Sequence, residues 1–342
     1  MRKINLLLVF LTLMLCSCSY YAHYNDAGSG QTTSEAGESV AGMETLSNPA
    51  RDFNGDRKTD ILFRSRSTGI IRQFLMNRNT ITSRSKVIGL SPEWEIVGVG
   101  DFGGDGKGDI LALNQKTSHL WLYQLNGANV QASNNVCALN LDLKVAGVAD
   151  FNGDKKADIL LRSKSAGVVW QYQMNGDAIT SSSKVTGLSL DWEIVGVGDF
   201  GGDGKGDVLA RNQKTGQLWL YQLNDAKVQS SNNVGALPLD WKVAGVSDFN
   251  GDKKADILFR SRSKGIIWQY QMNGSVIVVN SKVTGLSLDW EIVGVGDFGG
   301  DGKGDILARN LKTGQLWLYQ LDGVKVLASS SVGALDPDWV VQ

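Results

Sequence analysis

The chain of 342 residues has only 3 Cys, 4 Pro and 2 His. Two of the cysteines, Cys16 and Cys18, lie near the amino terminus, so Cys137 has no partner for an intrachain disulfide in the rest of the chain. A histidine-based catalytic centre is not predicted either, because His23 and His119 are isolated from each other and from any repeated motif. The composition, with 42% hydrophobic residues, 20% charged residues and 41 Gly, is that of a globular protein with many short strands and turns.

The amino terminus predicts export. A basic start, Arg2 and Lys3, precedes an apolar run from Leu6 to Leu15 that is too short for a membrane span and is typical of a secretory signal. Residues 1–17 are therefore predicted to be a signal peptide. The following Cys18 resembles the lipidated first residue of a bacterial lipoprotein, and Ser19 fits sorting to the outer membrane. An ordinary cleaved signal, with a periplasmic or secreted product, remains the alternative.

Residues 18–48 are rich in Ser, Gly, Thr, Ala and Glu and predict a flexible tether.

A carboxylate-rich loop of nine residues dominates the remaining sequence. It begins at Asp52 and returns at Asp101, Asp150, Asp199, Asp248 and Asp297, always 49 residues after the previous copy. Hard cations such as calcium prefer several oxygen ligands, and alternate residues of a tight loop can point theirs inward. Positions 1, 5 and 9 offer carboxylates, position 3 offers an amide oxygen in three copies, and position 7 offers a backbone carbonyl. The predicted metal ligands are Asp52, Asn54, Asp56, Lys58, Asp60, Asp101, Asp105, Lys107, Asp109, Asp150, Asn152, Asp154, Lys156, Asp158, Asp199, Asp203, Lys205, Asp207, Asp248, Asn250, Asp252, Lys254, Asp256, Asp297, Asp301, Lys303 and Asp305.

These loops match only the start of an EF-hand, because position 12 is Phe63 where that motif needs Glu, and the flanks predict strands instead of helices. Over residues 49–342 the repeated motif resembles FG-GAP/VCBS repeats, the calcium-loop blades of integrin α-subunits and of many secreted bacterial proteins. The resemblance implies a β-propeller that binds up to six structural calcium ions, one per loop. It also implies a binding or adhesion role, which in some members of the family is that of a lectin.

The six loops alternate between two types. The first, third and fifth read D-F-N-G-D-x-K-x-D, and the second, fourth and sixth read D-F-G-G-D-G-K-G-D. The second type has Gly103, Gly201 or Gly299 at position 3 and so lacks one side-chain ligand. We expect the first type to bind metal better, with water completing the second.

Each repeat predicts four short antiparallel strands. In the fourth copy, Gly216 and Asn224-Asp225 mark turns, and Leu218 to Leu223 alternates apolar and polar side chains. No helical periodicity is present, which excludes helical solenoids. Four-stranded repeats of this length predict an all-β propeller, in which the repeated tryptophans fill the space between blades.

Six periods of 49 residues predict six blades over residues 49–342. The chain ends at Trp339 to Gln342 with the beginning of another innermost strand, so we expect the C-terminal strand to close the ring. Seven blades are the alternative, although the chain lacks a seventh loop. Copies 98 residues apart match better than copies 49 apart, which indicates three two-blade units.

Charge and chemistry favour binding over catalysis. The formal net charge is −1, and eighteen of the 35 acidic residues are loop aspartates, so bound divalent cations would make the domain basic. Basic pairs after the first, third and fifth loops could then contact an anionic polysaccharide: Arg64 and Arg66, Arg162 and Lys164, Arg260 and Arg262.

No catalytic constellation emerges, so we expect a calcium-stabilised, non-catalytic module of the cell envelope or cell surface. Its predicted partner is a glycan or an envelope protein. We predict a monomer that binds no nucleic acid and contacts the membrane only through a lipid anchor. An envelope scaffold and a secreted polysaccharide hydrolase or lyase are the alternatives.

Overall fold

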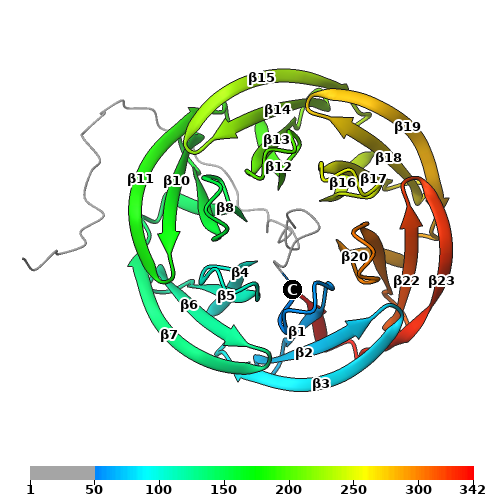
Figure 1. Cartoon of the computed structure of the whole chain (residues 1–342), viewed down its shortest axis with the longest axis horizontal. Helices are drawn as coiled ribbons and strands as arrows, with labels where there is room; N and C mark the ends of the chain where they lie inside the picture. The colour runs from blue at the N-terminus through cyan, green and yellow to red at the C-terminus, as the bar shows by residue number, and fades with distance from the viewer. Residues whose placement is uncertain (1–50) are drawn as a thin grey trace, which may run out of the picture.

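The computed structural model describes residues 51–342, which form six four-stranded antiparallel sheets arranged around a central axis (Figure 1). The predicted signal peptide, Cys18 and the predicted tether lie outside the described residues. No helix between residues 51 and 342 is long and apolar enough to cross a membrane. The chain builds one blade per repeat, with the innermost strand near the axis and the fourth strand at the rim.

The strands follow the order of the repeats. Blade 1 contains β1 (Ile61–Ser65), β2 (Ile70–Asn77), β3 (Thr80–Gly89) and the C-terminal β24 (Trp339–Val341). Blade 2 contains β4 (Trp94–Gly100), β5 (Asp109–Asn114), β6 (His119–Asn126) and β7 (Asn129–Ala138). Blade 3 contains β8 (Leu143–Ala149), β9 (Asp158–Ser163), β10 (Val168–Asn175) and β11 (Ala178–Gly187).

The second half repeats this pattern. Blade 4 contains β12 (Trp192–Gly198), β13 (Asp207–Asn212), β14 (Gln217–Asn224) and β15 (Lys227–Ala236). Blade 5 contains β16 (Trp241–Ser247), β17 (Asp256–Ser261), β18 (Ile266–Asn273) and β19 (Val276–Gly285). Blade 6 contains β20 (Trp290–Gly296), β21 (Asp305–Asn310), β22 (Gln315–Asp322) and β23 (Lys325–Ala334).

The C-terminal strand closes the ring. β24 pairs with β1 in antiparallel register, Phe63 opposite Val341 and Ser65 opposite Trp339, and so supplies the innermost strand of blade 1. The N–H of Gln342 adds a hydrogen bond of 2.9 Å to the carbonyl of Leu62. The prediction of six blades closed by the C-terminus is confirmed, and the seven-bladed alternative is wrong.

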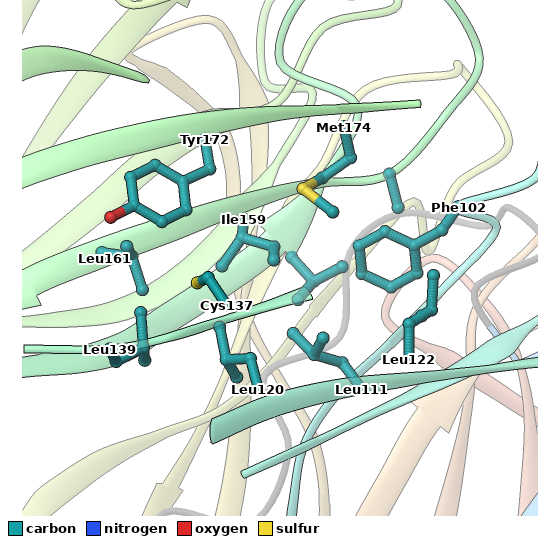
Figure 2. Close-up of a cluster of buried hydrophobic side chains, with 12 residues drawn as sticks. Phe102, Leu111, Leu120, Leu122, Cys137, Leu139, Ile159, Leu161, Tyr172 and Met174 are labelled. Atoms are coloured by element: carbon teal, nitrogen blue, oxygen red, sulfur yellow. The ribbon is translucent and has the colours of Figure 1, made fainter. Parts of the chain in front are cut away.

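The hydrophobic core is divided into clusters between neighbouring blades. In the cluster between blades 2 and 3, Phe102 and Leu122 from one blade face Ile159 and Met174 from the next (Figure 2). The phenylalanine at loop position 2 is fully buried in all six copies, so each loop is anchored in such a cluster. The repeated tryptophans pack against the same clusters while remaining half-buried, in agreement with the predicted role between blades.

Alternating side-chain sizes explain the period of 98 residues. The residue before each loop packs against loop position 8 of the following blade, and at every junction one of the two is glycine. A Cβ atom on Gly100 would lie 2.6 Å from that of Ala157, and one on Gly206 would lie 2.8 Å from that of Ala149. Such distances are too short for real Cβ atoms. Two neighbouring blades of the first, third and fifth type would therefore clash, and two of the other type would leave a gap between two glycines. An even number of blades satisfies this rule all the way round the ring.

Candidate functional site

The aspartate at loop position 1 organises the turn that follows it. In the second loop, Asp101 Oδ1 accepts the N–H groups of Gly104 (2.6 Å) and Asp105 (3.1 Å), and Oδ2 accepts that of Gly106 (2.7 Å). The other five loops repeat this pattern, which satisfies backbone donors that the tight turn would leave without partners. Burial raises the pKa of Asp101 in spite of these hydrogen bonds, and the charge of Asp105 raises it further.

The aspartate at position 9 ties the loop to the third strand of its blade. Asp109 Oδ2 accepts the N–H of Phe102 (3.0 Å), and Oδ1 accepts the N–H of Leu125 (2.8 Å). Burial raises the pKa of this carboxyl to about 7, and the charge of Asp101 contributes to the rise. The equivalent pKa values are about 7 in four other loops and about 8 for Asp305. Asp305 Oδ2 is buried without a hydrogen-bond partner.

The carboxylates at positions 1 and 9 face a common space beside position 3. A Cβ atom placed on Gly299 would lie 3.7 Å from both Asp297 Oδ1 and Asp305 Oδ2. In the alternate loops an asparagine occupies position 3. The carboxylate at position 5 is exposed on the rim of the loop, where in the first loop Asp56 Oδ1 accepts the N–H of Lys58 (3.0 Å).

This donor set suits a hard cation such as calcium, because it consists of carboxylate and amide oxygens and includes a buried oxygen without a partner. Among residues 51–342, however, no three His, Cys, Asp or Glu side chains are already gathered as a metal cluster. Calcium binding by the predicted ligands, and the predicted difference between the two loop types, therefore stay predictions.

The loops also join the blades into a closed ring. The N–H of loop position 8 donates to the carbonyl of position 1 in the preceding loop, as from Gly108 to Asp52 (2.8 Å). The same bond recurs at each junction, and the bond from Thr59 to Asp297 (2.7 Å) completes the circle. A second set of bonds connects the hairpin of each blade to position 2 of the preceding loop. Each loop is therefore a structural joint, whether or not it binds metal.

Lysine at position 7 contributes to the same joint. The aliphatic part of Lys156 lies against the glycine at position 4 of the preceding loop, where a Cβ on Gly104 would lie 3.1 Å from it. Its Nζ donates to Asn175 Oδ1 in the hairpin of its own blade (2.6 Å). The sequence predicts a role only for the carbonyl of this lysine, and the contact with the preceding blade explains why all six copies keep the side chain.

A cavity of about 650 Å³ opens where the loops of blades 2, 3 and 4 meet around the axis. We call this opening the channel mouth. Its walls combine aspartates, lysines and glycines of the loops with small residues of the innermost strands: Gly100, Asp101, Gly104, Asp105, Gly106, Val148, Ala149, Asp150, Lys155, Lys156, Ala157, Gly198, Asp199, Gly204, Lys205 and Gly206.

The family model described as FG-GAP-like repeat matches residues 52–112, 101–161, 150–210 and 248–308, which together make up more than half of the chain. The chain belongs to the FG-GAP-like repeat family. Each match begins at the first aspartate of one loop and extends into the next blade, so it includes the residues that form the blade junction. No curated protein matches the chain in sequence.

Solved structures share the fold of this FG-GAP propeller at low sequence identity. A structure of a nidogen/laminin complex is 13% identical with a TM-score of 0.56, over 82% of this chain and 95% of that one. The Tc holotoxin pore of Photorhabdus luminescens is 11% identical with a TM-score of 0.51, over 79% of this chain and 13% of that one. These similarities support the fold alone.

The face of the FG-GAP propeller opposite the loops holds buried arginines that the sequence presented as members of basic pairs. Arg162 is 5% exposed, and its Nη2 donates to the carbonyl of Ser189 in the connection to the next blade (3.1 Å). Arg64 and Arg260 make the equivalent bonds, so only the second members of the pairs are exposed: Arg66, Lys164 and Arg262. Arginine recurs at this strand position in five of the six blades. This recurrence is the feature of the sequence that could have indicated a bridge between blades.

The isolated histidine and cysteine take no part in the loop sites. His119 lies at the start of β6 on the opposite face, where Nδ1 is 2.9 Å from Asn135 Oδ1. Cys137 lies within β7, and its thiol is buried in the cluster between blades 2 and 3 (Figure 2). Neither residue is therefore placed as a nucleophile or base in a cleft.

Proposed function

We propose that this chain is a calcium-stabilised, non-catalytic binding module of the cell envelope whose ligand is a glycan. The observation that carries the proposal is the equivalence of the six loops. Each has a buried carboxylate at position 9, a buried or partly buried carboxylate at position 1 and an exposed carboxylate at position 5. In the three loops with glycine at position 3, the carboxylates of positions 1 and 9 face the space beside that glycine. Buried carboxylates that face each other are stabilised by a shared cation, and repeated sites suit multivalent binding to a repeating polymer.

Calcium has a structural role in this proposal. The loops join each blade to the next through hydrogen bonds of 2.6–2.8 Å from position 8 to position 1. A cation held by positions 1, 3, 5, 7 and 9 would fix the same residues that make these bonds. Extracellular calcium modules bind with dissociation constants of roughly 10⁻⁴ to 10⁻³ M, so envelope concentrations near about 1 mM would be sufficient.

A glycan array probed in calcium and in EDTA tests the proposal. We expect binding to a limited set of glycans that is lost in EDTA and restored by added calcium. Absence of binding to every glycan in calcium would overturn the proposed ligand class. Equal binding in both conditions would show that the bound ligand does not depend on the metal.

A protein partner is the second candidate, because the face opposite the loops exposes apolar side chains. Leu141, Leu190, Leu239 and Leu288 recur every 49 residues in the connections between blades and are 55–76% exposed. These exposed leucines occupy four consecutive blade connections and form an arc that a protein surface could cover. Replacing all four with serine should leave glycan binding unchanged, which separates this candidate from the first.

A further inference from the structure

Position 6 distinguishes three of the loops by a cationic side chain. Arg57, Lys155 and Lys253 occupy this position in the first, third and fifth loops, with φ angles of 64°, 67° and 67°. The second, fourth and sixth loops have glycine there, with φ angles of 81–82°. Because positive φ is unfavourable for residues with a Cβ atom, glycine would serve this turn better.

The three cationic side chains have no structural role in the described part of the chain. All three residues are exposed, and none of their side chains forms a hydrogen bond or ion pair with residues 51–342. They contrast with the lysines at position 7, whose amino groups donate to side-chain oxygens of their own blades. Residues that keep an unfavourable backbone conformation without contributing to packing are candidates for function.

The positions of these side chains direct them to the channel mouth. Gly106, Lys155 and Gly204, the position-6 residues of three consecutive loops, all line the cavity of about 650 Å³. Since the repeat places Arg57 and Lys253 equivalently, the three cations surround the axis at every second blade. The exposed carboxylate of Asp105, at position 5 of the second loop, lines the same cavity.

We propose that Arg57, Lys155 and Lys253 form a cationic triad at the channel mouth that binds acidic saccharides, such as uronate-containing polysaccharides. The ligand class follows from the mixture of charges, because a sugar acid offers carboxylates to the cations and hydroxyl donors to the position-5 aspartates. A phospholipid surface or a nucleic acid offers mainly phosphates, which can bind the cations but supply few hydroxyl donors to those aspartates. This inference rests on the proposed glycan-binding function and assigns it a site and a ligand class.

The test replaces each triad residue with the glycine of its sister loops, in the full-length variant R57G/K155G/K253G. The matched control is R66Q/K164Q/R262Q, which removes the same charge from three exposed residues on the opposite face. Gln115 and Gln213 occupy the equivalent positions in sister blades. Binding to polygalacturonate, with dextran as the neutral polymer, is measured by isothermal titration calorimetry in calcium.

We expect the triad variant to bind polygalacturonate roughly tenfold more weakly, because three charged contacts are lost, while the control variant stays within about twofold of the wild type. The melting temperature of the triad variant should equal or exceed that of the wild type, which separates lost binding from lost folding. Equal losses in both variants, or a loss only in the control, would overturn the site.

Two further binding measurements distinguish a failure of this inference from a failure of the proposed glycan-binding function. Wild-type protein that binds neutral glycans but not polygalacturonate would overturn the acidic ligand class and leave glycan binding intact. Anionic phosphatidylglycerol vesicles test the membrane as an alternative ligand. Binding to these vesicles that equals binding to polygalacturonate and depends on the triad would overturn the saccharide assignment.

Discussion

The buried aspartates at position 9 predict that pH and calcium control stability together. Asp60 has a pKa raised to about 7 by burial, whereas its ordinary value is 3.8. A raised carboxyl pKa means that the folded state holds the proton more tightly than the unfolded state. Stability is therefore greatest at low pH and falls as the pH rises through about 7.

The free energy linked to this pKa shift in all six loops is large compared with the stability of a domain. A shift of about three pKa units corresponds to roughly 4 kcal/mol for one ionised site as an upper limit. Six such sites would exceed the whole stability of an ordinary domain, which is about 5–15 kcal/mol. We therefore predict that a cation stabilises these carboxylates above neutral pH, whereas bound protons do so at low pH.

Thermal unfolding in EDTA and in about 1 mM calcium, at several pH values from 5.5 to 8, measures the effect. In EDTA we expect the melting temperature to fall by roughly 10 °C or more over this range, and in calcium to change little. The difference between the two curves should be widest at pH 8. Magnesium at the same concentration is the control for ionic strength.

Asp305→Asn is the matched variant, because an amide resembles the protonated carboxyl and Asp305 Oδ2 has no hydrogen-bond partner to lose. This variant should reduce the pH dependence in EDTA and gain less stability from calcium than the wild type. A melting temperature in EDTA that stays constant or rises from pH 5.5 to 8 would refute the reasoning. Identical curves in EDTA and calcium at pH 8 would refute a structural role for the metal.

Three further predictions concern the junctions between blades. Gly206→Ala should destabilise the protein by about 1–3 kcal/mol in urea unfolding, because the new Cβ would lie 2.8 Å from that of Ala149. Adding Ala149→Gly should recover most of this loss of stability. Arg211→Leu, which copies the residue of blade 2, should cost about 1–3 kcal/mol in the same assay, because the bonds to the carbonyls of Pro238 and Trp241 are both lost. An unchanged stability would show that this bridge between blades contributes nothing. Deletion of residues 339–342 should lower the melting temperature strongly and expose the edge of β1 to proteolysis, because β24 is the strand that pairs with β1 on this edge. Full resistance of the deletion variant to proteolysis would show that the ring closes by other means.

The sequence predicted the architecture because the information was periodic. The 49-residue spacing of the loops, the turns at Gly216 and Asn224-Asp225, and the incomplete repeat at Trp339 were sufficient for the strand order, the blade count and the closure. The predicted ligands at positions 1 and 9 face a common space beside position 3, and calcium binding there stays a prediction.

Contacts between neighbouring repeats could not be predicted in this way. Lys156 and Arg162 look alike in the sequence as solvent-exposed cations, yet one packs on the preceding loop and the other bridges to the following blade. The burial of Asp109 likewise depends on Phe102 and Leu125, which meet it only after the blade has formed. The recurrence of these residues marks their positions as special, but it does not show which neighbouring blade each side chain contacts.

The glycine that alternates across each blade junction restricts how this chain can change in length. Loss or duplication of a single 49-residue repeat would bring two bulky residues together at one junction, or leave a gap between two glycines. Gain or loss of 98 residues would preserve every junction. Propellers of this type should therefore gain or lose two blades at a time. Duplication and deletion should act on the two-blade unit instead of the single blade.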